Sequence, residues 1–200
     1  MFGLTSSMPP RAVGLGVLGV VGVSLLRRHL SSRSSLRELI STTGKKAVCI
    51  GKNYREHITE LAQLGPEWKL EEEPEPVLFL KPTTSYAWPG TPLVLPRRRP
   101  GCPVAAKLGV HHELELAVVI GTRARHVTND ESAMASVAGY VLALDMTERD
   151  EQTAAKNKGM PWTVAKGYDT FLPLSEPFEL APGEDWRKLR LWLEGACSLG

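Results

Sequence analysis

The sequence predicts a β-rich α+β domain. Three observations support this: the apolar segments are short and of strand length, helical periodicity is confined to a few stretches, and proline-rich links join the segments. With 200 residues, 42% of them hydrophobic and 23% charged, the chain has the size and composition of a globular protein with a core. It contains no G-x-G-x-x-G sequence and no P-loop, which argues against a nucleotide-binding α/β fold.

Residues 1–43 are predicted to be a mitochondrial transit segment that precedes a domain over residues 44–200. The apolar run 12–26 contains four glycines and is shorter than the roughly 20 residues that span a bilayer. An arginine- and serine-rich stretch with no acids follows it, as in transit peptides. A secretory signal and a membrane anchor are the alternatives, and we expect no stable membrane insertion. The predicted location is the mitochondrial matrix, with the cytosol as the alternative.

The positive charge of the chain is concentrated in this first segment. Residues 1–44 carry five arginines and one acid, a net charge of +4, whereas the whole chain carries +2, so the remainder is −2. The triplet Arg97-Arg98-Arg99 has no flanking aromatic residues. We therefore expect no nucleic-acid partner.

The first half of the domain is predicted to alternate short strands with irregular links. Residues 46–50 and 77–80 are apolar runs of strand length. Residues 54–64 place their apolar side chains on one helical stripe, and Gly65-Pro66 ends the helix. Five prolines make residues 89–103 an irregular connection.

The second half is predicted to contain two longer strands followed by mixed elements. The predictions are strands over residues 111–121, 139–144 and 189–193, a helix over 147–158 with Thr147 as its N-cap, and an extended segment over 161–165.

The strand over 111–121 carries two carboxylates on one face. Glu113 and Glu115 alternate with leucines, so they lie about 7 Å apart on the same side. Asp145 ends the next apolar strand and is a third candidate. Carboxylates this close repel one another unless a cation bridges them, and oxygen ligands without cysteine suit Mg²⁺, Mn²⁺ or Ca²⁺ rather than Zn²⁺. The pattern alone is equally compatible with an exposed sheet face and an ordinary turn.

Basic and polar side chains supply candidate catalytic groups. His57 and Glu60 are three residues apart on a predicted helix, so the carboxylate is placed to raise the basicity of the imidazole and make it a general base. Cations near apolar runs are candidate anion contacts. These predicted contacts are Lys81, Lys166 and Arg149, with Gln152 one turn beyond Arg149. The alternative for each is a solvated surface residue.

The cysteines predict a reduced compartment. Cys49, Cys102 and Cys197 form no C-x-x-C pair, so a zinc ribbon or thioredoxin-like centre has no support. Cys49 lies within the apolar run 46–50 and is predicted to be a core residue rather than a nucleophile.

Together these segments resemble the fumarylacetoacetate hydrolase family, in unbroken order from about Lys45 to Leu193. The matching pieces are Gly51-Lys52-Asn53-Tyr54 with His57 and Glu60, Pro76 to Pro82, His111 to Leu116, Leu144 to Asp150, and Pro161 to Lys166. The order and number of these pieces make the resemblance specific. It is greatest to the mitochondrial branch of the family that hydrolyses acylpyruvates and decarboxylates oxaloacetate.

The resemblance implies a mixed β-sheet roll with short helices, a homodimer, and a Mg²⁺ or Mn²⁺ ion acting on a small 2-oxo acid. The family's metal ligands match Glu113, Glu115 and Asp145. Its lid helix matches His57 and Glu60, and its substrate contacts match Arg149, Gln152 and Lys166.

This resemblance implies C3–C4 bond cleavage that leaves a pyruvate enolate. An acylpyruvate needs a water, which His57 and Glu60 would activate to attack the C4 carbonyl. Oxaloacetate loses CO₂ without an attacking water, and reprotonation of the enol form without cleavage would make the reaction a keto–enol tautomerisation.

Two departures from the family pattern bear on activity. Residues 96–110 contain an insertion-like stretch, and the resemblance stops at Leu193, where the family continues with further strands. We therefore expect the C-terminal strands to be missing, with lower stability and weak or absent activity. The alternatives are a non-catalytic binding or dimerising remnant, and a member that hydrolyses fumarylacetoacetate-like substrates or hydrates 2-oxo alkenoates.

Overall fold

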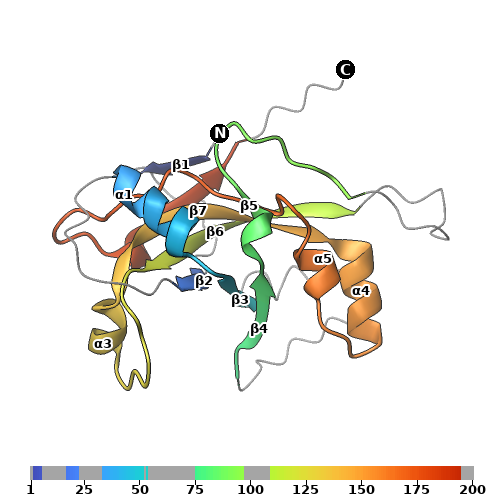
Figure 1. Cartoon of the computed structure of the whole chain (residues 1–200), viewed down its shortest axis with the longest axis horizontal. Coiled ribbons are helices and arrows are strands. Elements are labelled where there is room, and N and C mark those ends of the chain that lie inside the picture. The colour runs from blue at the N-terminus through green and yellow to red at the C-terminus, as the bar shows by residue number, and fades with distance from the viewer. Residues whose placement is uncertain are drawn as a thin grey trace.

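The computed structural model describes residues 2–5, 17–22, 33–51, 53, 75–96 and 109–194. Its centre is a five-stranded mixed sheet of order β4-β3-β2-β6-β7 (Figure 1). Its strands are β2 (Val17–Gly22), β3 (Ala47–Gly51), β4 (Val77–Lys81), β6 (Val110–Ile120) and β7 (Val137–Glu148). The β2–β6 pair is parallel and the other three pairs are antiparallel.

Short elements surround this sheet. Two small pairs add to it: β1 (Phe2–Thr5) runs antiparallel to β9 (Arg190–Leu193), and β5 (Tyr86–Ala87) runs parallel to β8 (Leu172–Pro173). The helices are α1 (Arg33–Glu38), the π-helical turn η1 (Leu39–Thr43), α3 (Asp130–Met134), α4 (Arg149–Asn157), α5 (Thr163–Lys166), and the 3₁₀ turns η2 (Thr83–Ser85) and η3 (Trp186–Lys188). Figure 1 shows α4 and α5 at one end of the long β6–β7 pair and α3 at the other. None of the described helices has the length and hydropathy needed to cross a membrane.

The β6–β7 pair is the longest ladder in the described chain, running from Val110 opposite Glu148 to Ile120 opposite Val137. Side chains alternate along it, and both faces are covered. One face belongs to a core that also includes β3, η1 and β8; we call it the first core. It contains Ile40, Ala47, Cys49, Ala117, Val119, Val141, Ala143, Leu172 and Leu174. The other face belongs to the second core, formed by Leu116, Tyr140 and Leu142 with surrounding half-buried residues.

The predicted fold class is confirmed, and the predicted strands are present. The runs over residues 46–50, 77–80, 111–121 and 189–193 correspond to β3, β4, β6 and β9. The strand predicted over 139–144 is longer in the structure, since β7 keeps pairing with β6 as far as Glu148. The helix predicted over 54–64 lies outside the described residues.

The prediction of Thr147 as a helix N-cap is wrong. Thr147 is a buried residue of β7, paired opposite His111, because the ladder holds its backbone extended. The helix α4 starts two residues later, and Glu148 is its N-cap: a Glu148 carboxylate oxygen accepts a 2.6 Å hydrogen bond from the Glu151 backbone N–H.

The prediction of an extended segment over 161–165 is also wrong. This stretch turns into the short helix α5, in which the Lys166 and Gly167 N–H groups donate to the Trp162 and Thr163 carbonyls at 3.0 and 2.9 Å. Ala165 and Lys166 are buried by this turn. Tertiary packing therefore overrides the weak helix propensity of Thr163 and its β-branched neighbour.

The folded part of the chain begins before the boundary predicted at residue 44. Leu36 of α1 and Ile40 of η1 are buried, and Ile40 belongs to the first core. Strand β2 lies between β3 and β6 in the sheet. The assignment of residues 1–43 as a transit segment stays a prediction.

Gly139 supplies a test of the packing between α1 and β7. A Cβ at this position would lie 2.9 Å from both Leu36 Cδ1 and the Phe178 backbone oxygen, closer than side-chain carbons approach such atoms. Because the oxygen belongs to the main chain and cannot swing away, we expect Gly139→Ala to lower the free energy of unfolding by about 1–3 kcal/mol in a denaturant titration.

The matched control is Gly109→Ala, whose added Cβ would meet Arg149 Cβ at an ordinary 3.5 Å. Its free energy of unfolding should change by less than about 0.5 kcal/mol. Equal free energies of unfolding for the two variants would contradict the close packing of Gly139 against Leu36 and Phe178.

Candidate metal centre

The β6–β7 ladder brings three carboxylates together. Glu113 lies opposite Asp145 in the register, and Glu115 follows two residues later on the same face. Leu114 and Leu116, between and beyond them, point to the second core. As a result, the three carboxylates converge. One oxygen of each residue, Glu113, Glu115 and Asp145, lies within 4.8 Å of one oxygen of the other two. The predicted convergence of these residues is thus what the structure contains.

Among the described residues, Glu113 is the most exposed of the three carboxylates. Asp145 and Glu115 are buried, with 2% and 5% of their surface exposed to solvent, whereas 20% of the Glu113 side-chain surface is exposed. The carboxylates continue the face of β6 and β7 that covers the first core, so apolar residues close the inner side. A small ion or ligand would reach the cluster past Glu113.

Lys166 is a buried cation that contacts two of the three carboxylates. Its Nζ donates to Thr147 Oγ1 at 2.6 Å and to Glu113 Oε2 at 3.1 Å, and it also forms a short ion pair with Asp145 Oδ2. Burial acts to lower the pKa of Lys166, but the carboxylates of Asp145 and Glu113 outweigh burial and raise that pKa above its usual value. Lys166 is therefore charged near neutral pH. Its ammonium lies 4.7 Å from the centre of the Phe79 ring, on the apolar side of the cluster.

Lys81 lies beneath the cluster. Its side chain has no exposed surface, and its Nζ is 2.9 Å from Asp145 Oδ1. Burial lowers the pKa of Lys81 below its usual value, while Asp145 acts in the opposite direction. The role of Lys81 as a substrate contact stays a prediction; in the described structure its ammonium has no exposed surface.

Arg149 and Gln152 lie beside the cluster, one turn apart on the helix after Asp145, and their predicted role as substrate contacts stays a prediction. They lie in the first turns of α4, directly after the end of β7. Arg149 Nη1 donates to Gln152 Oε1 at 2.7 Å, and Nη2 forms a short ion pair with Glu113 Oε1. A guanidinium in this place is suited to bind a carboxylate of a small ligand.

The donor set fits a hard divalent ion. Oxygen ligands that share one Mg²⁺, Mn²⁺ or Ca²⁺ lie within about 5 Å of one another, as these three carboxylates do. Asp145 Oδ1 is buried, and its partner in the described structure is the Lys81 ammonium at 2.9 Å. No soft ligand belongs to the described cluster, so the residues present match Mg²⁺ or Mn²⁺ better than Zn²⁺.

Two predicted catalytic residues cannot be placed. His57 and Glu60 belong to the segment 54–74, outside the described residues, as does most of the insertion-like stretch within 96–110. Thr147, in contrast, was not predicted to be a site residue, yet its hydroxyl accepts from Lys166. Its spacing of two from Asp145 would have revealed it if β7 had been extended to Glu148 in the prediction.

Cys49 is a core residue, as predicted. It is 2% exposed and belongs to the first core, on the same face as the cluster. Burial, helped by the nearby charge of Asp145, raises the pKa of the Cys49 thiol to about 12. This thiol is therefore not ionised near neutral pH and is a poor nucleophile.

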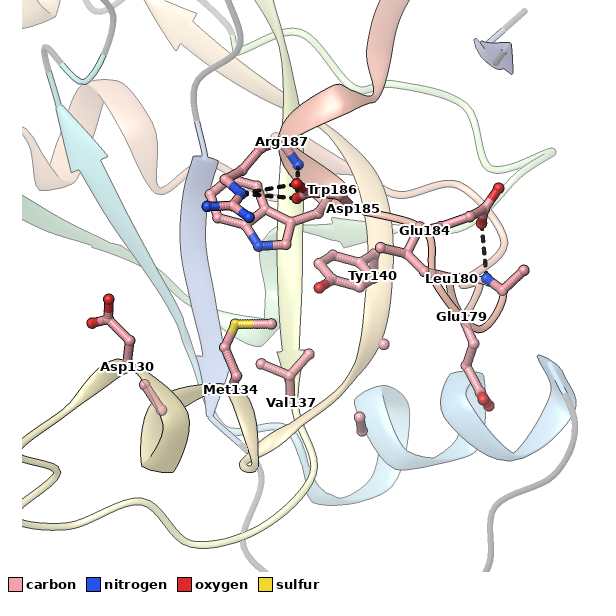
Figure 2. A pocket seen from close by; sticks show the side chains of 14 residues that line it. Asp130, Met134, Val137, Tyr140, Glu179, Leu180, Glu184, Asp185, Trp186 and Arg187 are labelled. Carbon is pink, nitrogen blue, oxygen red and sulfur yellow. Dashed lines mark hydrogen bonds and ion pairs between the residues drawn. The ribbon is translucent and has the colours of Figure 1, made fainter.

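A hollow of about 850 Å³ lies elsewhere, beside Tyr140 and Trp186 (Figure 2). Tyr140 belongs to the second core, so the hollow lies across the sheet from the carboxylate cluster. Two of its acids are already engaged: Asp185 accepts from the Arg187 side chain, which lowers the pKa of Asp185, and Glu184 accepts from the Ala181 N–H. These two carboxylates of the hollow are therefore occupied by hydrogen bonds within the protein.

Comparison with known proteins gives one family match and several similar proteins. Residues 46–195 match the family model described as fumarylacetoacetate (FAA) hydrolase C-terminal. The chain is 46% identical to the mitochondrial oxaloacetate tautomerase FAHD1 of Bos taurus over 153 residues, which cover 76% of this chain and 61% of that protein. It is 44% identical to the mitochondrial oxaloacetate decarboxylase of Dictyostelium discoideum over 151 residues, which cover 75% of this chain and 62% of that protein.

Two solved structures have a fold similar to that of this chain. A fumarylacetoacetate hydrolase family protein of Yersinia pestis superposes with a TM-score of 0.56 at 37% identity, covering 70% of this chain and 58% of that one. The fumarylpyruvate hydrolase of Pseudomonas aeruginosa, solved with Mn²⁺ and pyruvate, superposes with a TM-score of 0.52 at 26% identity, covering 86% and 62%. The chain spans about three fifths of the length of the relatives it matches.

The state of Cys49 can be tested by alkylation. Because its pKa is raised to about 12, almost no thiolate exists at mildly alkaline pH in the folded chain. We expect iodoacetamide to modify Cys49 at least about 100-fold more slowly in the native protein than in denaturant. Peptide mass spectrometry after timed quenching gives both rates, and equal rates would contradict the burial described.

Proposed function

Since this chain belongs to the fumarylacetoacetate hydrolase family, we propose that it is built for metal-dependent chemistry at C3 and C4 of small 2-oxo acids. The observation that carries the proposal is the carboxylate cluster of Glu113, Glu115 and Asp145 flanked by Lys166 and Arg149. The printed activities of relatives, oxaloacetate tautomerase and oxaloacetate decarboxylase, support oxaloacetate as a substrate. Hydrolysis of acylpyruvates is the second proposed reaction, supported by the fumarylpyruvate hydrolase among the solved structures.

Glu113, Glu115 and Asp145 would hold the ion, proposed to be Mg²⁺ or Mn²⁺. When bound there, it would act as a Lewis acid toward the 2-oxo acid end of the substrate. Mn²⁺ is the ion in the Pseudomonas aeruginosa structure. The half-exposed position of Glu113 gives a small anionic ligand its access.

The described basic residues suit an anionic substrate whose negative charge shifts during the reaction. Arg149 is proposed to bind a carboxylate at the rim, and Gln152, held by the Arg149 guanidinium, to donate its amide to a substrate oxygen. Lys166 is proposed to stabilise the negative charge that develops on the 2-oxo oxygen as the C3–C4 bond breaks. Its burial matters here, since a charge acts more strongly where water is excluded.

The two reactions differ in their need for a base. In acylpyruvate hydrolysis, His57 with Glu60 is proposed to take a proton from the water that attacks C4. In oxaloacetate decarboxylation, C4 leaves as CO₂ and no water attacks. Tautomerisation needs only proton transfer at C3 and the oxo oxygen.

An alternative is a chain that binds the ion, or a partner subunit, without turnover. A homodimer and a mitochondrial location are further proposals; the relatives' names, which place them in mitochondria, support the location.

The first test is the double variant Glu113→Ala, Glu115→Ala in the 200-residue chain. Removing two ligands should lower Mg²⁺-dependent consumption of oxaloacetate and acetylpyruvate by at least about 100-fold. EDTA should have the same effect on the unmodified protein, and added Mg²⁺ should reverse it. Coupled pyruvate detection measures both substrates.

The control removes the same charge elsewhere, with Glu131→Ala and Glu179→Ala, both exposed and remote from the cluster. This control should keep its activity. A folded unmodified chain that binds Mn²⁺ but consumes neither substrate would favour the non-catalytic alternative.

A second test separates the two reactions. His57→Asn removes the proposed general base, so we expect acetylpyruvate hydrolysis to fall by about 100-fold or more. Oxaloacetate decarboxylation should stay within a few fold of the unmodified protein, because that reaction needs no attacking water. An equal loss of both reactions would contradict the assignment of His57 as the water-activating base.

A further inference from the structure

Lys81 is the largest side chain with no exposed surface in the described part of the chain. It is the last residue of β4, and it is paired with Ala47 of the first core, so its side chain points from the sheet toward the carboxylate cluster. An ammonium group buried in this way is costly unless each of its N–H groups finds an acceptor.

Three backbone carbonyls satisfy this requirement. Lys81 Nζ donates to the carbonyl oxygens of Met146, Lys166 and Phe171 at 2.9, 2.6 and 2.9 Å. They come from three separate segments: strand β7 next to Asp145, the last residue of α5, and the loop before β8. An ammonium has three N–H groups, which matches the number of these carbonyls.

Asp145 Oδ1 is a fourth oxygen close to the Lys81 ammonium. It forms an ion pair with Lys81 Nζ at 2.9 Å. Asp145 is therefore held between two ammonium groups, with Oδ1 on Lys81 and Oδ2 on Lys166.

We propose that Lys81 is a positioning residue, which sets the distance between the Asp145 carboxylate and the Lys166 ammonium by joining the backbone of β7 to the backbone of α5. This inference rests on the proposed function of the cluster and adds a residue that touches neither ion nor substrate. The three carbonyls converge on one tetrahedral nitrogen. A planar guanidinium keeps the charge but cannot point three N–H groups at acceptors arranged in this way.

The decisive variant is therefore Lys81→Arg, which conserves the charge and changes only the geometry. We expect kcat for oxaloacetate to fall by about 100-fold, since displacing a catalytic group by about 1 Å costs that much. KM for oxaloacetate should stay within about threefold, because no substrate contact is lost. The Kd for Mn²⁺, measured by calorimetry or electron paramagnetic resonance, should rise by about fivefold or more.

Two further variants complete the experiment. Lys81→Met removes charge and donors together, is also expected to lower kcat, and replaces Lys81→Arg if the arginine variant does not fold. Lys158→Met, at an exposed position after α4, is the control and should match the unmodified protein.

Several outcomes would overturn the proposal. A raised KM with unchanged kcat and unchanged Mn²⁺ affinity would make Lys81 a substrate contact. A lower melting temperature with unchanged kcat and Mn²⁺ affinity would make its role purely structural, and so would failure of both variants to fold.

Failure of the proposed function is distinguishable. If the unmodified chain binds Mn²⁺ but turns nothing over, that function fails while the Mn²⁺ affinities still decide the role of Lys81. If the unmodified chain binds no Mn²⁺, both proposals fall.

Discussion

The balance of buried charge around Asp145 is the constraint on which the site depends. Three carboxylates, Glu113, Glu115 and Asp145, share one end of the first core, where repulsion between them is poorly screened. Lys81, Lys166 and Arg149 offset that charge at short range. Removing one partner from such a group leaves an uncompensated buried charge, which costs about 3–5 kcal/mol. The elements that carry these six residues are therefore coupled: β4, β6, β7, α4 and α5 must all be in place together.

Part of this arrangement could be predicted from the sequence because it depends on local periodicity. The alternation in β6 placed Glu113 and Glu115 on one face, and the end of an apolar run marked Asp145. The spacing of Arg149 and Gln152 predicted that they lie one turn apart on the helix after Asp145, and in the structure both belong to α4. In each case, residues close in sequence have their relative direction fixed by the strand or helix that carries them.

The other features depend on contacts between distant segments. The N-terminal end of α4 is set by how far β7 pairs with β6, and a helix pattern read alone assigned Thr147 to the wrong element. The helical turn of α5 exists because Lys166 is drawn to Asp145 and Thr147, which lie about twenty residues earlier in the chain. Lys81 looked like a lysine at the end of an apolar strand, and sequence could not reveal that its three acceptors come from β7, α5 and the loop before β8. The predicted roles of His57 and Glu60 rest on the sequence alone, since their segment lies outside the described residues.

The same charge balance bears on what the centre would bind. The six described side chains bring three negative and three positive charges, so the cluster is close to neutral by itself. With a divalent ion held by the carboxylates, the region would carry two surplus positive charges within a largely buried space. Water is excluded on the inner side by the first core, so these charges are offset most effectively by an anion that enters past Glu113 and meets Arg149. A small 2-oxo dicarboxylate brings two negative charges, which restores neutrality, whereas a neutral ketone of the same size does not. Charge therefore favours an anionic ligand over a neutral one at this centre.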